Sequence, residues 1–132
     1  MNVARYKMRW EYAAVFLGGA AGSMLRGIAI PSLPTLDWVT ATFMVNMAAC
    51  FILGWLYAIR HRVHAHVMHL GAVGFCGGLS TFSTYAAEIY NIMVVGANIS
   101  AVTASLLEIA CGIGIALVGE RIGRRYHSED RS

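Results

Sequence analysis

Charged side chains are scarce in this sequence. Asp, Glu, Lys and Arg make up only 13% of the 132 residues, whereas a soluble domain carries roughly 25%. A water-soluble globule of this size needs a more polar surface, so that class is disfavoured. Only 2 prolines are present, and 3 cysteines stand apart from one another in apolar stretches. Collagen-like, disordered and disulfide-stapled chains are therefore excluded, which leaves a small integral membrane protein.

Long apolar runs are abundant instead. Hydrophobic residues make up 58% of the chain, and the mean hydropathy is +0.59. Because about 20 apolar helical residues cross a bilayer, the sequence predicts a single all-α integral membrane domain over 1–132 with four transmembrane helices. These helices are expected at about 12–30, 38–59, 68–95 and 98–119, followed by a polar tail at 120–132.

The third run, 68–95, is too long for one straight crossing and holds a stretch rich in glycine and hydroxyl groups. We expect a helix broken near 77–83. Irregular backbone at membrane depth persists only where protein buries it or where it lines a polar path, so the break predicts a site. Close helix packing through the Gly74–Gly78 pair is the alternative, and it leaves the neighbouring hydroxyl groups unexplained.

Basic residues are distributed very unevenly between the predicted loops. Nine of the ten Lys and Arg residues lie in the N-terminal arm, the loop after the second span and the tail, and none lies in 31–37 or 96–97. This bias predicts that both termini are cytoplasmic. It also accounts for the net charge of +3 through contact with the lipid bilayer, without a nucleic-acid partner. A cleaved signal peptide is disfavoured because Arg26 interrupts the first apolar run.

Several polar residues lie inside the predicted spans. Thr42 and Asn46 share a helix face in the second, where Asn46 is either a functional amide or an interhelical hydrogen bond. Glu88 and Glu108 are acidic residues in the third and fourth spans, and Arg26 lies near the end of the first. Such groups face a bundle interior or water and usually pair. An Arg26–Glu108 pair and a proton-coupled Glu108 carboxylate both remain open.

Four histidines crowd the loop after the second span, at positions 61, 64, 66 and 69. They are either a transition-metal site or solvated interfacial side chains, and the second interpretation is favoured. The cysteines have no metal-binding spacing. No nucleophile–base pair is recognisable, so we expect that the chain is not an enzyme.

Three segments resemble the CrcB/Fluc family of fluoride channels. The run Gly77–Tyr85 followed by Glu88 resembles the signature of the family's third helix. The pattern over 41–54, with Thr42 and Asn46, resembles the second helix, and the glycines before Arg26 resemble the first. The match covers three of the four spans in order.

The resemblance implies a fluoride-specific ion channel that exports toxic intracellular fluoride passively across a bacterial inner membrane. It implies an antiparallel dimer with a structural sodium ion that is not transported. By similarity, main-chain carbonyls of Gly77 and Ser80 would hold the sodium ion. The expected pore residues are Asn46, Phe82, Ser83, Thr84 and Tyr85.

Two departures from the family pattern concern the pore. Tyr85 stands where the family has a second phenylalanine, and Glu108 would place a negative charge beside an anion path. The strong charge bias also predicts one fixed orientation, and hence pairing with an inverted paralogue rather than a homodimer. The alternatives are a four-helix proton-coupled multidrug exporter and the non-conducting subunit of a heterodimeric channel.

Overall fold

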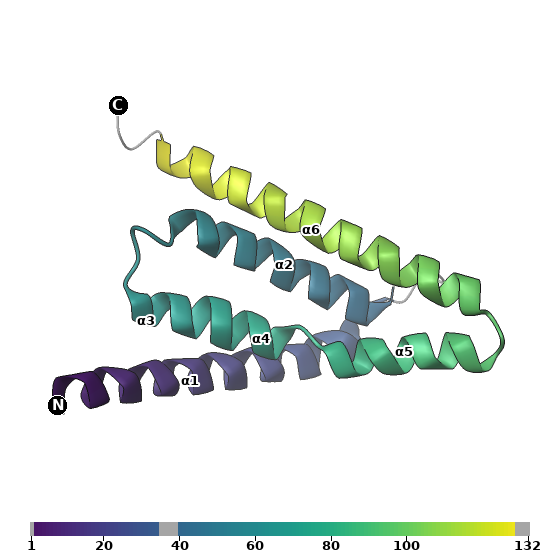
Figure 1. Ribbon diagram of the computed structural model, residues 1–132, viewed down its shortest axis with the longest axis horizontal. Coiled ribbons are helices and arrows are strands. Elements are labelled where there is room, and N and C mark those ends of the chain that lie inside the picture. Colours follow the sequence, from purple (N-terminus) through teal and green to yellow (C-terminus); the bar gives the residue numbers. More distant parts are fainter. Residues whose placement is uncertain (1, 35–39, 129–132) are drawn as a thin grey trace.

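The computed structural model describes residues 2–34 and 40–128, and this part of the chain contains helices and no strands. Figure 1 shows helical stretches that run alternately in opposite directions. Both ends of the described chain and the turn after α2 lie at one end of the bundle, at the left of Figure 1. The turn at Gly96 lies at the other end, as does the start of α2. The stretches comprise α1 (Asn2–Ser32), α2 (Ala41–Ile59), a compound stretch between Ala65 and Val94, and α6 (Asn98–Ser128).

Three helices are long and apolar enough to cross a membrane: Met8–Ser32, Ala41–Ile59 and Asn98–Tyr126. They correspond to the first, second and fourth predicted spans, and the chain is a multi-pass membrane protein. Trp38 and Val39, at the expected start of the second span, lie outside the described residues. Helix α6 continues through residue 128, so most of the expected polar tail is helical, and residues 129–132 of that tail are likewise outside the description.

The third stretch consists of short helical pieces, none of which alone has the length of a membrane span. Two consecutive extended residues, Ser80 (ψ 154°) and Thr81 (φ −142°, ψ 115°), separate the last two pieces. The π-helical turns before them were not expected from the sequence. The pieces are α3 (Ala65–Met68), the π-helix η1 (His69–Phe75), α4 (Cys76–Leu79) and α5 (Phe82–Val94).

Glycines bring α1 very close to η1 and α4. A β-carbon at Gly18 would lie 2.0 Å from the Leu70 carbonyl oxygen, and one at Gly78 would lie 2.2 Å from the Gly19 carbonyl oxygen. Gly74 similarly meets the backbone of α1. The Gly74–Gly78 pair is therefore a packing surface, as the structural interpretation of these glycines predicted.

A second glycine contact joins α2 to α6. A β-carbon at Gly54 would lie 1.9 Å from the Ala116 carbonyl oxygen, and one at Gly119 would lie 2.3 Å from the Phe51 carbonyl oxygen. Without side chains at these positions the two backbones touch directly. Helix α6 is thereby held against α2 along its length, which positions Glu108 relative to α2.

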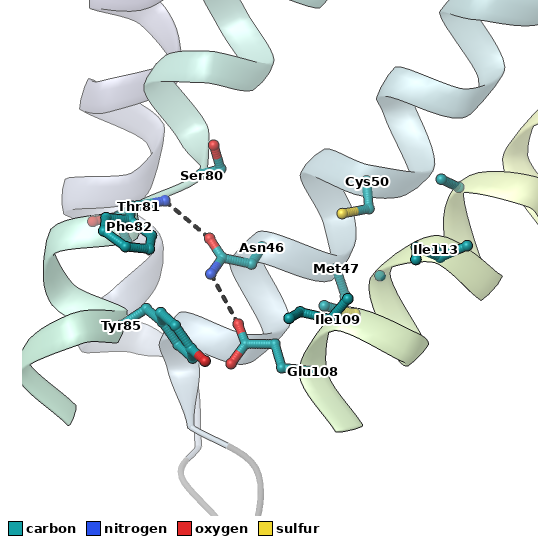
Figure 2. A pocket seen from close by; sticks show the side chains of 12 residues that line it. Asn46, Met47, Cys50, Ser80, Thr81, Phe82, Tyr85, Glu108, Ile109 and Ile113 are labelled. Carbon is teal, nitrogen blue, oxygen red and sulfur yellow. Dashed lines mark hydrogen bonds between the residues drawn. The ribbon is translucent and has the colours of Figure 1, made fainter. Parts of the chain in front are cut away.

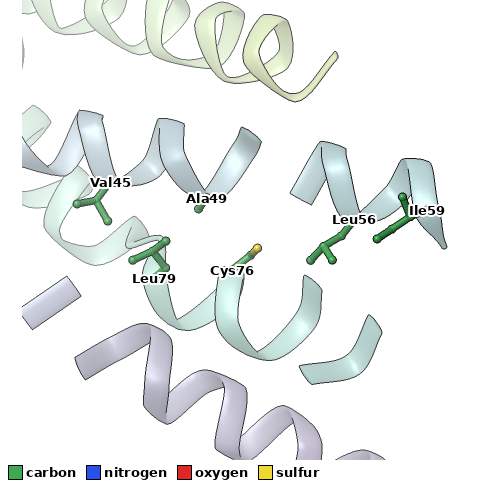
Figure 3. Close-up of a cluster of buried hydrophobic side chains, with 6 residues drawn as sticks. All are labelled: Val45, Ala49, Leu56, Ile59, Cys76 and Leu79. Carbon is green, nitrogen blue, oxygen red and sulfur yellow. The ribbon is translucent and has the colours of Figure 1, made fainter. Parts of the chain in front are cut away.

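The buried core lies between α2 and α4. Figure 3 shows six side chains that fill this layer: Val45, Ala49, Leu56, Ile59, Cys76 and Leu79. Outside it, large apolar side chains of the long helices point away from the chain, including Phe16 (74% exposed) and Ile99 (83%). Helix α5 has no buried residue. These outer faces suit lipid or another membrane helix rather than water.

Candidate functional site

Asn46 of α2 connects the interrupted stretch to α6. Its Oδ1 atom accepts a hydrogen bond from the Thr81 amide (2.9 Å), and its Nδ2 atom donates to Oε1 of Glu108 (3.1 Å). Figure 2 shows this chain of contacts. Because Thr81 is extended, its N–H has left the helical hydrogen-bond pattern and needs an outside acceptor. Asn46 supplies that acceptor, so its amide is a part of the interruption rather than a chance contact.

Hydroxyl groups gather at the N-terminus of α5. The Thr81 Oγ1 atom accepts a hydrogen bond from the Thr84 amide (3.3 Å) and thereby caps the helix. The same hydroxyl donates to Thr84 Oγ1 (3.1 Å) and lies 3.3 Å from Ser83 Oγ. The positive end of the α5 dipole lies here as well. Ser83 and Thr84, two of the predicted pore residues, are thus brought together with Thr81.

The two predicted pore aromatics form a pair one turn apart on α5. The ring centroids of Phe82 and Tyr85 are 6.1 Å apart, and the ring planes are inclined by 46°. Phe82 is 81% exposed in the single chain. Figure 2 shows the Tyr85 hydroxyl directed toward the Glu108 carboxylate. Tyr85 and Glu108, the two residues that differ from the family pattern, therefore lie with the Tyr85 hydroxyl directed at the Glu108 carboxylate.

Asn46, Phe82 and Tyr85 line a pocket of about 490 Å³ between α2, the interruption, α5 and α6, whereas Ser83 and Thr84 are not among its lining residues. Most of its wall is apolar, and Glu108 is the only formally charged residue among those that line it. The lining residues are Asn46, Met47, Cys50, Ser80, Thr81, Phe82, Tyr85, Glu108, Ile109, Gly112, Ile113 and Ala116. An apolar pocket with a few convergent polar groups is the usual form of a small-ligand or ion path.

Arg26 and Glu108 have different partners. Arg26 Nη1 donates to the main-chain carbonyl of Ser80 (3.0 Å), whereas Glu108 accepts from Asn46. The structure therefore does not show the Arg26–Glu108 pair, which was one of the two interpretations left open by the sequence. The physical reason is that α1 packs on η1 and α4, while α6 packs on α2, so the two side chains reach opposite sides of the interruption.

Glu88 and Thr42 lie outside the pocket. Glu88 Oε2 accepts a hydrogen bond from Thr40 Oγ1 (3.1 Å), which ties α5 to the start of α2. Thr42, in the first turn of α2, is buried (2% exposed). Sequence reasoning missed Thr40, although its place directly before an apolar run is typical of a helix N-cap, and it does cap α2 through the Phe43 amide.

The end of α4 offers oxygen ligands for a hard cation. Because Thr81 donates to Asn46, the Gly77 carbonyl lacks the amide that a continuous helix would present to it four residues later. Nothing lies within 4 Å of the β-carbon position at Gly77, so the backbone there is accessible. The Ser80 carbonyl already accepts from Arg26 and keeps a second lone pair. The Gly77 carbonyl and the second lone pair of the Ser80 carbonyl are oxygen ligands of the kind that sodium takes, and a further subunit would have to add the remaining ligands.

Among the described residues, no three His, Cys, Asp or Glu side chains approach closely enough to hold a metal ion. The structure does not bring three of the loop's histidines together. His69 instead has its Nδ1 atom 2.7 Å from the Ala65 carbonyl oxygen.

Comparison with known proteins gives consistent matches over most of the chain. The family model described as "CrcB-like protein, Camphor Resistance (CrcB)" matches residues 13–120. A relative from Ruegeria pomeroyi is 56% identical over 114 residues, covering 86% of this chain and 90% of the relative. One from Ignicoccus hospitalis is 35% identical over 114 residues, covering 84% and 93%. Both are named fluoride-specific ion channel FluC. A third, from Staphylococcus saprophyticus, is 30% identical over 118 residues (87% and 98%) and is named fluoride-specific ion channel FluC 2.

Proposed function

This chain belongs to the CrcB family, which is one of ion channels rather than enzymes, and from that premise we propose that it is a fluoride-specific ion channel. It exports toxic intracellular fluoride by passive conduction. The observation that supports this most strongly is that Asn46, Thr81 and the Phe82–Tyr85 pair line one pocket, with the Ser83 and Thr84 hydroxyls next to Thr81.

Conduction of fluoride requires groups that replace its strongly held water. The Asn46 amide and the hydroxyls of Ser83 and Thr84 are hydrogen-bond donors. The ring edges of Phe82 and Tyr85 carry partial positive charge and can also face an anion. The N-terminus of α5 adds the positive end of its dipole. Selectivity follows from a narrow path with these donors, which disfavours larger anions by fit and cations by charge.

The interrupted stretch forms the third of four membrane crossings. Its pieces run in one direction between the two ends of the bundle (Figure 1). The extended residues at its centre are covered on both sides, by Asn46 and by Arg26. Backbone of this kind is tolerated at membrane depth because protein groups satisfy it.

A second, inverted subunit completes the path. One chain leaves Phe82 on its surface and lines the pocket with α2, α5, α6 and the extended residues Ser80 and Thr81. The uncovered apolar faces of α1, α5 and α6 supply area for the contact. The partner is either a second copy or a paralogue, and the one-sided distribution of basic residues supports a paralogue in the opposite orientation. The number in the name of the Staphylococcus saprophyticus relative agrees with paralogous pairs.

A structural sodium ion, if bound, is held by the Gly77 and Ser80 carbonyls of both subunits. It would raise the local potential for anions. Arg26, which contacts the Ser80 carbonyl, contributes positive charge to the same region. Both termini are proposed to lie in the cytoplasm, because nine of the ten Lys and Arg residues lie in the N-terminal arm, the loop after the second span and the tail. A bacterial inner membrane is what the family resemblance implies.

Fluoride efflux from vesicles tests the proposal. Purified protein, alone and together with a paralogue, is reconstituted into fluoride-loaded vesicles without a proton gradient, and external fluoride is followed with a selective electrode. Efflux that greatly exceeds that of protein-free vesicles, with chloride retained, is the expected result. Efflux of a cationic drug only when a proton gradient is applied would instead indicate the proton-coupled exporter. Flux that requires the paralogue's intact pore residues but not those of this chain would identify a non-conducting subunit, an alternative favoured by the positions of Tyr85 and Glu108 in the pocket.

A further inference from the structure

The Glu108 carboxylate occupies the pocket side of Asn46. Its Oε1 atom lies 3.1 Å from Asn46 Nδ2, the donor that the proposed path offers to an anion. The carboxylate is thus an internal anion bound where a fluoride ion would bind. A fluoride ion that reached this amide would lie within a few ångströms of a full negative charge.

No positively charged residue lines the pocket beside Glu108. From α2, Asn46 contacts it and Cys50 lines the same pocket, and from α5 the Tyr85 hydroxyl points toward it. Glu108 is the only formally charged residue that lines the pocket, and Arg26, on the other side of the interruption, contacts Ser80. The charge state of the pocket is therefore governed by one carboxyl group.

We propose that Glu108 determines conduction by competing with fluoride for the Asn46 amide, so that the pocket is closed to fluoride when Glu108 is ionised and open when it is protonated. This inference rests on the proposed channel function. In the protonated state the charge is gone, the amide is released, and the carboxyl O–H becomes one more donor to the anion. Protonation is favoured as the pH falls, so fluoride flux rises on acidification.

The main test compares three proteins in the vesicle assay with equal pH on both sides, between pH 8 and pH 5. Flux through the unaltered channel should fall as the pH rises across this range. Glu108→Gln should give a flux that does not depend on pH and that, at neutral pH, exceeds the unaltered channel's. Glu120→Gln is the matched control on α6, outside this pocket, and should keep the unaltered pH profile. Protein-free vesicles measure the leak of hydrogen fluoride, which is subtracted.

A second measurement does not depend on flux. Because protonation and fluoride binding favour one another, fluoride should raise the proton affinity of Glu108. Infrared difference spectra at constant neutral pH should show loss of a carboxylate band and gain of a carboxylic-acid band on addition of sodium fluoride, but not of sodium chloride. The signal should be missing in Glu108→Gln and present in Glu120→Gln.

The outcomes separate the two proposals. The role of Glu108 is overturned if the flux of Glu108→Gln still depends on pH, or if fluoride still induces the infrared band in that variant. Either result leaves the channel function intact. A lower neutral-pH flux in a folded, dimeric Glu108→Gln also overturns it. Absence of fluoride flux from the unaltered protein and all variants at every pH overturns the channel function and the inference with it.

Discussion

Replacement of Gly54 by alanine should force α6 away from α2. A β-carbon at this position would lie 1.9 Å from the Ala116 carbonyl oxygen and 2.7 Å from the carbonyl carbon. Ordinary van der Waals contact begins at 3.4 Å, so the backbone of α6 must retreat by about 1.5 Å, the difference between 3.4 and 1.9 Å. Side-chain rotation does not relieve the clash because the three nearest atoms all belong to the backbone of Ala116.

Overpacking of this kind costs about 1–3 kcal/mol of unfolding free energy. The displacement also reaches the pocket, because α6 carries Glu108. The 3.1 Å contact between Glu108 and Asn46 should lengthen beyond hydrogen-bonding distance. Gly54→Ala is therefore expected to lower both the stability of the helix pair and the integrity of the site.

The matched control is Gly114→Ala on α6, where nothing lies within 4 Å of the added β-carbon. Alanine should be neutral or stabilising there by about 0.5–1 kcal/mol because it favours the helix. Thermal unfolding in detergent, followed by circular dichroism, should give a midpoint several degrees lower for Gly54→Ala and an unchanged or higher one for the control. Equal midpoints for the two variants would refute the close backbone contact between α2 and α6.

Four further results are expected. Asn46→Leu should remove the acceptor of the Thr81 amide, costing about 1–3 kcal/mol of stability, and should eliminate fluoride efflux; unchanged efflux would remove Asn46 from the path. Thr81→Val should lower stability by about 0.5–2 kcal/mol through loss of the α5 cap, while Thr81→Ser should restore it in the same melt. Phe82→Ile should abolish efflux and leave the dimer intact by size-exclusion chromatography. Reporters fused to the C-terminus should signal only from the cytoplasm, and equal signals from both sides would contradict a fixed orientation.

The long helices were predictable because lipid imposes a simple rule on composition. Three apolar runs suffice to identify α1, α2 and α6: 38–59 has no charged residue, and 12–30 and 98–119 have one each. The interruption at Ser80–Thr81 falls inside the 77–83 range expected from glycine and hydroxyl content. Both expectations depend on local sequence alone, which is why they could be made without a structure.

Contacts between distant residues could not be predicted in the same way. Asn46 and Glu108 are 62 positions apart, and nothing in their local sequences indicates that they meet. Their contact follows from the glycine packing of α2 on α6, which depends on the register of two backbones. The same dependence explains why Arg26 contacts Ser80 rather than Glu108. Composition also did not predict where the helices end. Helix α6 extends to Ser128, and the Arg124–Glu120 pair supports its last turns.

The π-helical turns of η1 have a consequence for how sequence changes in this region are tolerated. They accommodate more residues per turn than an α-helix does, and so they offset the phase of everything that follows. Loss of one residue between His69 and Phe75 would be absorbed by reversion to α-helical winding. The residues downstream would then keep their orientation. Loss of one residue between Cys76 and Leu79, where the winding is already α-helical, would instead rotate them by about 100° and turn the hydroxyls near Thr81 away from α2. The extra residue in the wide turns thus sets how the groups that contact Asn46 are oriented relative to the surface that packs on α1.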